Sequence, residues 1–213
     1  MGYKAFASMN IAIVGNEKMS AVLAQGLALA GHEVLIGIKE NELVSFDFLL
    51  SEFENIFVMS IEDAAEAADV IFLTASPENV RESAYLLDDV RSKVIVDTTF
   101  MNFANDGNYI NTVSAIRAIT GSPYVVKCFN AAGFEAMSNT RKKDNTIDMF
   151  VAGDSKKAKE VLKLLARDLG FSECHDFGGM DSVPLLDEMA LCYQNLAVKQ
   201  AEGEKIAIRI TRP

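Results

Sequence analysis

The sequence has few of the residues that mark several classes of protein. Its 213 residues include two histidines, three cysteines, four prolines and no tryptophan. Two histidines are too few for a histidine-rich metal centre, and an odd number of scattered cysteines argues against a disulfide framework. We therefore predict no metal site and reduced thiols, which are typical of a cytoplasmic protein.

Positive charge and long apolar runs are also scarce. Lys and Arg number 20 against 30 Asp and Glu, which gives a net charge of -10. Such a surface repels nucleic acids and anionic membranes, so we predict neither as a partner. No apolar run approaches the roughly 20 residues that cross a bilayer, and the N-terminal MGYKAFASMN lacks the apolar segment of a secretory signal. The sequence predicts a protein without a membrane span whose partner is a small-molecule substrate.

What the sequence has in abundance is apolar residues in short blocks. Hydrophobic residues make up 50% of the chain and charged residues 23%, enough for a core and its surface. Continuous blocks such as VIFLT and KVIVD are typical of strands buried on both faces of a parallel sheet. The predicted strands are Asn10–Val14, Glu33–Ile38, Ile56–Met59, Val70–Thr74, Val94–Asp97, Tyr124–Phe129, Ile147–Ala152 and Ser172–His175. The predicted helices are Met19–Ala30, Ile61–Ala68, Pro77–Leu87, Tyr109–Ile119, Ser155–Leu169 and Val183–Val198, with Ser60 and Asp154 as N-caps of the second and fifth.

This alternation of strands and helices predicts an α/β fold: a Rossmann-like, doubly wound and mainly parallel sheet with helices on both faces. We expect an NAD(P)-binding domain over residues 9–178 and a short C-terminal helix–strand extension over residues 179–213, packed on the same domain. The last predicted helix carries an apolar stripe that indicates a core-facing side or a homodimer contact. The stripe consists of Val183, Leu186, Met189, Ala190 and Tyr193.

The stretch from Ile11 to Ile38 reads as strand, tight turn, helix and strand, the opening of a dinucleotide-binding fold. The pattern G-x-G-x-x-G falls on Gly15, Glu17 and Ser20, so only its first glycine is present. Ser20 is small enough to replace the third glycine, whereas Glu17 adds bulk and a carboxylate beside two phosphates. Like charges ~4 Å apart in a partly wet site repel by about 4 kcal/mol before relaxation. The free backbone amides at the start of the helix still attract an anion. The stretch from Ile11 to Ile38 therefore either binds a nucleotide weakly or contributes only to folding.

In a dinucleotide-binding fold, the residues at the end of the second strand contact the ribose of the bound dinucleotide. Lys39 there can pair with the 2′-phosphate of NADP, and Glu40 can instead bond the ribose hydroxyls of NAD. The charge of Lys39 favours NADP, and a solvated Lys–Glu pair is the alternative.

Four segments of the chain resemble the deazaflavin (coenzyme F420)-dependent NADP oxidoreductase family, which includes the STEAP-like reductase domains. They are IAIVGNEKMSAVLAQGLALAGHEVLIG, EDAAEAADVIFLTASPENV, SPYVVKCFNAAGFEAMSN and MFVAGDSKKAKEVLKLLARDLGF. The closing KIAIRITR is similar to the family's last strand. The resemblance implies a nicotinamide cofactor, NADP or NAD, and a flavin-like second redox partner.

The resemblance also assigns roles by position. It places Gly15, Asn16, Glu17, Lys18 and Met19 under the pyrophosphate; Ile38 and Lys39 at the 2′-phosphate; Thr74, Ala75 and Ser76 against the ribose and nicotinamide; and Asn130, Ala131 and Gly133 beside the nicotinamide. Hydride transfer between two rings depends on their placement more than on an acid or a base. We therefore nominate no general acid and name Asn130 and Thr98 only as candidate orienting residues.

The sequence thus predicts an NAD(P)-dependent oxidoreductase that prefers NADP. It would pass hydride between the nicotinamide and a flavin-like, or small carbonyl or imine, acceptor. The alternative is a non-catalytic nucleotide-binding or regulatory module on a degenerate reductase scaffold. Glu17, Ser20, Ile38 and the shifted Pro77 favour this alternative, because all four weaken the same pocket.

Overall fold

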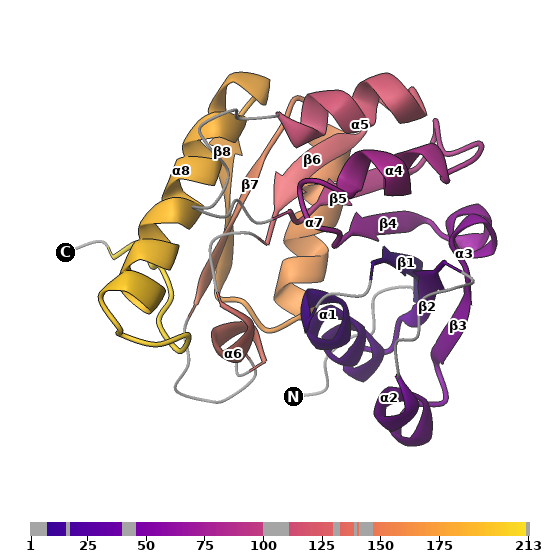
Figure 1. The fold of residues 1–213 in the computed structure, drawn as a ribbon, viewed down its shortest axis with the longest axis horizontal. Helices are drawn as coiled ribbons and strands as arrows, with labels where there is room; N and C mark the ends of the chain where they lie inside the picture. Colours follow the sequence, from indigo (N-terminus) through magenta and orange to yellow (C-terminus); the bar gives the residue numbers. More distant parts are fainter. Residues whose placement is uncertain are drawn as a thin grey trace.

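The computed structural model describes residues 8–15, 18–39, 46–99, 111–129, 133–138, 140 and 147–211. Within these residues, eight strands form one sheet in the order β3-β2-β1-β4-β5-β6-β7-β8 (Figure 1). The strands are β1 (Asn10–Val14), β2 (Glu33–Ile38), β3 (Ile56–Ser60), β4 (Val70–Leu73), β5 (Val94–Asp97), β6 (Val125–Cys128), β7 (Asp148–Ala152) and β8 (Glu173–Gly178).

The sheet is mainly parallel, as predicted. The six strands β1 to β6 are parallel to one another, whereas β7 is antiparallel to β6 and parallel to β8. The order reverses between β1 and β4, which is the switch point of a doubly wound sheet. In such sheets, ligands bind outside the carboxyl ends of the strands at this point.

Helices cover both faces of the sheet and enclose two apolar cores. One core lies against α1 (Lys18–Leu29), α2 (Asp47–Glu52), α6 (Phe134–Met137) and α7 (Lys156–Asp168). The other lies against α3 (Ile61–Ala67), α4 (Val80–Tyr85), α5 (Thr112–Thr120) and α8 (Val183–Gln194). Strand β1 serves both, because Ile11 and Ile13 face the first core while Ala12 and Val14 face the second.

Side-chain caps fix the starts of three helices. Ser60 accepts a hydrogen bond from the Asp63 amide at 3.1 Å, as the sequence predicts, and starts α3. Ser155 accepts from the Ala158 amide at 3.1 Å and starts α7. The prediction of Asp154 as the cap of α7 is therefore wrong. The Asp154 carboxylate instead accepts from Arg117 and from the Met180 amide, so it joins three segments. Asn111 caps α5 in the same way as the two serines.

The C-terminal extension differs from the prediction at its end. Helix α8 continues into a π-helical turn, Asn195–Lys199. Together the two elements match the predicted helix. The predicted closing strand is not formed: between residues 201 and 211, only Ala207 makes an isolated bridge. The Ile210 amide donates to Asp148 Oδ2 at 2.9 Å, so a side chain takes the place of a strand partner. Among the described helices, none is both long and apolar enough to cross a bilayer.

Candidate functional site

The predicted cofactor residues that the structure describes lie at or after the carboxyl ends of β1, β2, β4 and β6. These strands lie at or near the switch point. Asn16, Glu17, Asn130 and Ala131 lie outside the described residues.

A tight junction joins the end of β1 to the segment after β4. Gly15 has a φ of +134°, and a Cβ atom there would lie 2.5 Å from Thr74 Oγ1 and 3.0 Å from the Ala75 amide nitrogen. Ser20 is fully buried, its hydroxyl donates to the Gly15 carbonyl at 2.8 Å, and it lies 2.7 Å from Thr74 Oγ1. Thr74 Oγ1 donates in turn to the Val14 carbonyl at 3.1 Å. The junction therefore holds the first turn of α1 against both strands, and Ser20 fits where the motif has its third glycine.

The first turn of α1 follows this junction directly. Lys18 is the first residue of the helix and is exposed, whereas Met19 is buried in the core. A helix of this length offers unpaired amides at its N-terminus, which favour an anion. The described residues fit a pyrophosphate here, because the Gly15 backbone, the first turn of α1 and the Lys18 cation follow one another directly. After β4, Ala75 is buried and Ser76 is half-buried.

The end of β2 carries a charge that is already paired. Lys39 follows the strand, and its Nζ lies 2.8 Å from Glu82 Oε1 of α4. Ile38 packs its half-buried side chain on the core beneath α1. The resemblance assigns both residues to the 2′-phosphate, but the structure shows that Lys39 has an acidic neighbour. Glu82 is not among the residues predicted from the sequence.

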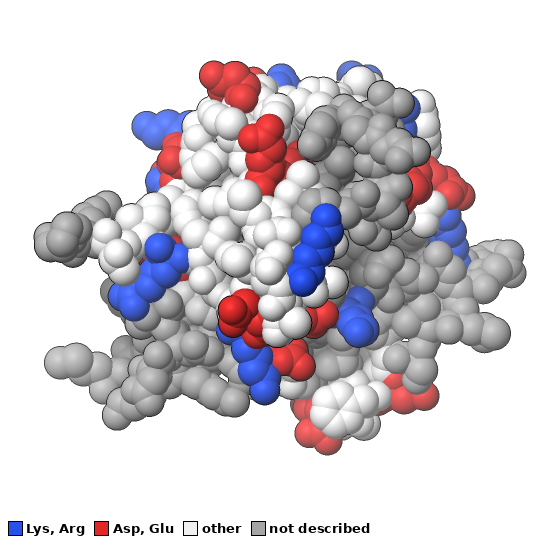
Figure 2. Space-filling model, turned by 60° about the vertical axis from the view of Figure 1, so that its left-hand side comes forward, with Lys and Arg blue, Asp and Glu red and all other residues white. Residues whose placement is uncertain are grey.

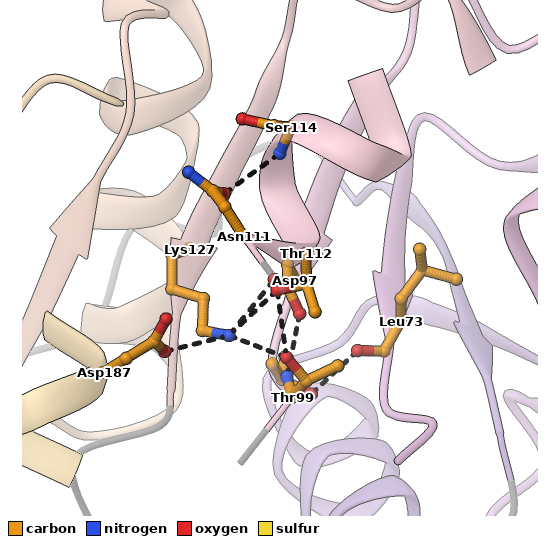
Figure 3. Close-up of polar contacts among 9 residues, drawn as sticks. Leu73, Asp97, Thr99, Asn111, Thr112, Ser114, Lys127 and Asp187 are labelled. Carbon is orange, nitrogen blue, oxygen red and sulfur yellow. Dashed lines mark hydrogen bonds and ion pairs between the residues drawn. The ribbon is translucent and has the colours of Figure 1, made fainter. Parts of the chain in front are cut away.

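A buried charge cluster lies at the ends of β5 and β6 (Figure 3). The Lys127 side chain is fully buried, and its Nζ lies 3.1 Å from Asp97 Oδ2, 3.1 Å from Asp187 Oδ1 and 2.6 Å from Thr99 Oγ1. Thr112 Oγ1 lies 3.3 Å from the same ammonium and donates to Asp97. The Thr99 amide also donates to Asp97 Oδ1, at 2.9 Å. We call Asp97, Thr99, Thr112, Lys127 and Asp187 the Lys127 cluster.

The Lys127 cluster positions segments and does not present a reactive amine. The ammonium has three protons, and four oxygen atoms lie around it. These partners come from β5, the segment after it, the start of α5, and α8. A buried side chain with these partners is held in place and is not free to reach a substrate. The cluster therefore fixes the segment after β5 against α5 and α8.

Thr98, a candidate orienting residue, lies beside this cluster. Its amide and its hydroxyl both donate to the Leu73 carbonyl, at 3.0 Å and 2.9 Å. The hydroxyl proton is thus committed to β4, so Thr98 Oγ1 can only accept a further hydrogen bond. Gly133, which the resemblance places beside the nicotinamide, packs closely on α8: a Cβ there would overlap the Tyr193 hydroxyl. Burial, together with nearby Glu204 and Glu135, raises the pKa of Tyr193, so its phenol stays neutral.

The sequence contains only partial signals for the remaining polar residues around the site. Lys127 stands inside an apolar strand, and a lysine so placed must find partners. Asp97 ends the neighbouring strand in direct register with it. Asp187 and Glu82 give no such signal, since each is one acidic residue on an ordinary helix.

Comparison with known proteins agrees with the resemblance predicted above. Residues 10–100 match the family model described as "NADP oxidoreductase coenzyme F420-dependent". The resemblance is confirmed over this part of the chain. The match runs from β1 through β5 and includes the Gly15 junction, Lys39 and Glu82.

Solved structures share the fold over nearly the whole chain. A protein from Arthrobacter sp. FB24, provisionally assigned as an F420-dependent NADP reductase, has a TM-score of 0.81 at 20% identity and covers 96% of this chain and 100% of its own. A hypothetical protein from Sinorhizobium meliloti has a TM-score of 0.72 at 18% identity, with 97% of each chain covered. A pyrroline-5-carboxylate reductase from Coxiella burnetii has a TM-score of 0.61 at 15% identity and covers 92% of this chain and 71% of its own. At these identities, the likeness establishes the shared Rossmann-like fold.

Proposed function

We propose that the protein is an NAD(P)-dependent oxidoreductase that prefers NADP. It transfers hydride between the nicotinamide and a flavin-like, or small carbonyl or imine, acceptor. The family match over residues 10–100 supports the nicotinamide cofactor, since it spans the part of the sheet that holds the switch point. The acceptor rests on the sequence resemblance alone.

The Gly15 junction carries this proposal. A Cβ at Gly15 would clash with Thr74 Oγ1 and with the backbone at Ala75, so the chain there is as close-packed as a dinucleotide turn requires. The junction also places the N-terminus of α1 at the carboxyl end of β1. A pyrophosphate would accept hydrogen bonds from the helix amides with Lys18 close by, and Lys39 would meet the 2′-phosphate.

The residues near the nicotinamide end supply placement and no proton. A bound nicotinamide would supply the hydride, and the role of these residues would be to bind and orient it against the acceptor. Thr98 Oγ1 would accept a hydrogen bond from a bound amide, because its own proton is donated to Leu73. The Lys127 cluster would keep the Thr98–Thr99 segment in one position. This arrangement suits a reaction driven by proximity and orientation.

The scaffold alternative also has a specific observation in its favour. The Lys39 ammonium is paired with Glu82, so the cation expected to bind a 2′-phosphate already has a partner. A regulatory module would bind the nucleotide or another anion without turnover.

Isothermal titration calorimetry with NADPH and NADH tests the proposal. We expect both to bind, NADPH more tightly, and added flavin or imine acceptors to consume NADPH. Binding without turnover by any acceptor would favour the regulatory module. If neither nucleotide binds at millimolar concentration, the oxidoreductase proposal fails.

The Glu17→Gly substitution adds a sharper test of the phosphate turn. Removing the carboxylate should tighten NADPH binding about tenfold, on the order of 1.4 kcal/mol. Glu17→Gln keeps the bulk and removes only the charge, so comparison of the two separates repulsion from crowding. Unchanged affinity in both variants would show that the turn is not weakened by Glu17.

We also propose that the protein is cytoplasmic and that two copies of it associate as a homodimer. The face that carries α8 is turned forward in Figure 2, where an uncharged area lies between acidic and basic side chains. Leu185 is 54% exposed on α8, and Leu196 and Val198 are 48% and 64% exposed on the turn that follows it. Sedimentation equilibrium, with Leu196→Glu as the disrupting variant, tests whether this surface joins two copies.

A further inference from the structure

The ion pair between Lys39 and Glu82 spans the switch point of the sheet. Lys39 follows β2, and Glu82 lies in the first turn of α4, which follows β4. Because β1 lies between β2 and β4, the pair bridges the carboxyl end of β1. The adenosine half of a dinucleotide binds at this end of a doubly wound sheet. The two side chains thus meet where the ribose 2′ position would lie.

The pair is accessible and loosely held. The Lys39 side chain is 29% exposed and the Glu82 side chain is 65% exposed, with 2.8 Å between Nζ and Oε1. Exposed pairs of this kind contribute little to stability, so an incoming anion can replace the carboxylate. A phosphate carries a larger charge than a carboxylate and offers three acceptor oxygens to the same ammonium.

The two side chains favour different cofactors. A cation at this place accommodates the 2′-phosphate of NADPH, whereas a carboxylate accepts hydrogen bonds from the free ribose hydroxyls of NADH. Glu82 therefore opposes NADPH in two ways: it occupies Lys39, and it repels the phosphate. It does neither to NADH.

We propose that Glu82 is a specificity-determining residue that reduces the preference for NADPH over NADH by competing with the 2′-phosphate for Lys39. This inference rests on the proposed function. It goes beyond that function because it assigns the degree of cofactor preference to a residue of α4. On this proposal the wild-type chain binds both nucleotides with a small preference for NADPH, and loss of the carboxylate increases that preference.

Calorimetric titration of the wild-type chain and Glu82→Gln with NADPH and NADH tests the proposal. We expect Glu82→Gln to tighten NADPH binding about fivefold and to change NADH binding less than twofold or weaken it. The shorter probes 2′,5′-ADP and 5′-AMP should show the same contrast, which would place the effect at the 2′ position.

A matched control separates this effect from net charge. Glu33 is exposed at the start of β2, on the opposite edge of the sheet, roughly 20 Å from Lys39. Glu33→Gln removes the same charge and should change affinity for either nucleotide less than twofold. Glu82→Gln should tighten NADPH binding less in the Lys39→Met background than in the wild-type chain, because only the repulsion between the carboxylate and the phosphate remains once Lys39 is removed.

The outcomes distinguish the two proposals. If the wild-type chain binds both nucleotides and Glu82→Gln leaves their affinity ratio unchanged, Glu82 does not set the preference, and the oxidoreductase proposal stands. If Glu82→Gln tightens NADPH binding no more than Glu33→Gln does, the inference is also overturned. Absence of binding by the wild-type chain and by Glu82→Gln overturns both.

Discussion

Gly15 and Gly31 both have positive φ angles, but replacing them should cost the fold different amounts of stability. Gly15 has a φ of +134° and is crowded by Thr74, whereas Gly31 has a φ of +91° and would leave an added Cβ in open space. Alanine at either position costs backbone strain of about 1 kcal/mol or more. At Gly15 the clash adds to that strain.

We therefore expect Gly15→Ala to lower the free energy of unfolding by about 2 to 4 kcal/mol, and Gly31→Ala by about 1 kcal/mol. Urea denaturation followed by circular dichroism measures both values. Equal losses in the two variants would mean that the junction with Thr74 is not tight.

The role of Lys127 could not be predicted from the sequence, for a physical reason. Its partners Asp97 and Asp187 lie 30 residues before it and 60 residues after it along the chain. Only the fold brings them within 3.1 Å. The junction at Gly15 was predictable in outline, since the turn motif is local. Its hydroxyl contacts were not, because Thr74 follows a different strand, β4.

At the scale of elements, the Lys127 cluster joins β5, β6, α5 and α8. Lys127→Met removes the ammonium and leaves two carboxylates buried without it. We expect a loss of about 3 to 5 kcal/mol in the free energy of unfolding. Lys156→Met, at an exposed position on α7, should change it by less than about 0.5 kcal/mol.

Thermal and urea denaturation of both variants provide the comparison. If Lys127→Met fails to fold, Thr112→Val removes one hydroxyl of the cluster and should cost about 1 to 3 kcal/mol. A Lys127→Met variant as stable as Lys156→Met would show that the buried charges do not hold these elements together.

Helix α7 is tied to β8 by Lys159, whose Nζ lies 2.8 Å from Asp176 Oδ1. Partial burial alone would raise the pKa of Asp176, but the hydrogen bonds from Lys159 and the Gly178 amide hold it below the usual 3.8. A carboxyl group whose pKa is lower in the folded state stabilises the fold above its unfolded pKa. That contribution is lost as the pH falls through the folded pKa.

We expect the urea midpoint to decline below about pH 4, and Asp176→Asn to reduce that decline. Asp181→Asn, at an exposed position before α8, is the control and should leave the decline unchanged. An identical acid profile in the wild-type chain and Asp176→Asn would contradict the role of this pair.

The elements themselves were largely predictable, because buried strands appear as continuous apolar blocks. The eight strands lie close to their predicted ranges, and the predicted cap at Ser60 is confirmed, whereas α7 is capped by Ser155 in place of the predicted Asp154. Two short helices were missed: α2 buries only Leu49 within its bounds, and α6 spans Phe134–Met137. Such segments depend on tertiary packing, since one turn of helix has little stability of its own.

At the scale of the whole molecule, several contacts attach residues 179–213 to the rest of the chain. Among them are the Lys127–Asp187 pair, the packing of Tyr193 on Gly133 and the hydrogen bond from the Ile210 amide to Asp148. We therefore predict that residues 9–178 and 179–213 unfold in a single transition. Hydrogen exchange measured by mass spectrometry should give α8 and β6 the same slowest opening rate. Exchange of α8 well before β6 would mean that the extension opens by itself.

The two outer strands of the sheet differ in how they meet other chains. At one end β8 carries Glu173, His175 and Asp176, whereas at the other β3 reads IFVMS, with Phe57 43% exposed. Edge strands that carry charged side chains rarely pair with strands of another molecule, whereas uncharged edge strands pair with them more readily. Heat-induced aggregation should therefore start at β3. At a temperature where Phe57→Lys and the wild-type chain are unfolded to the same extent, light scattering should rise more slowly in the variant. An equally fast rise in both would show that aggregation does not start at β3.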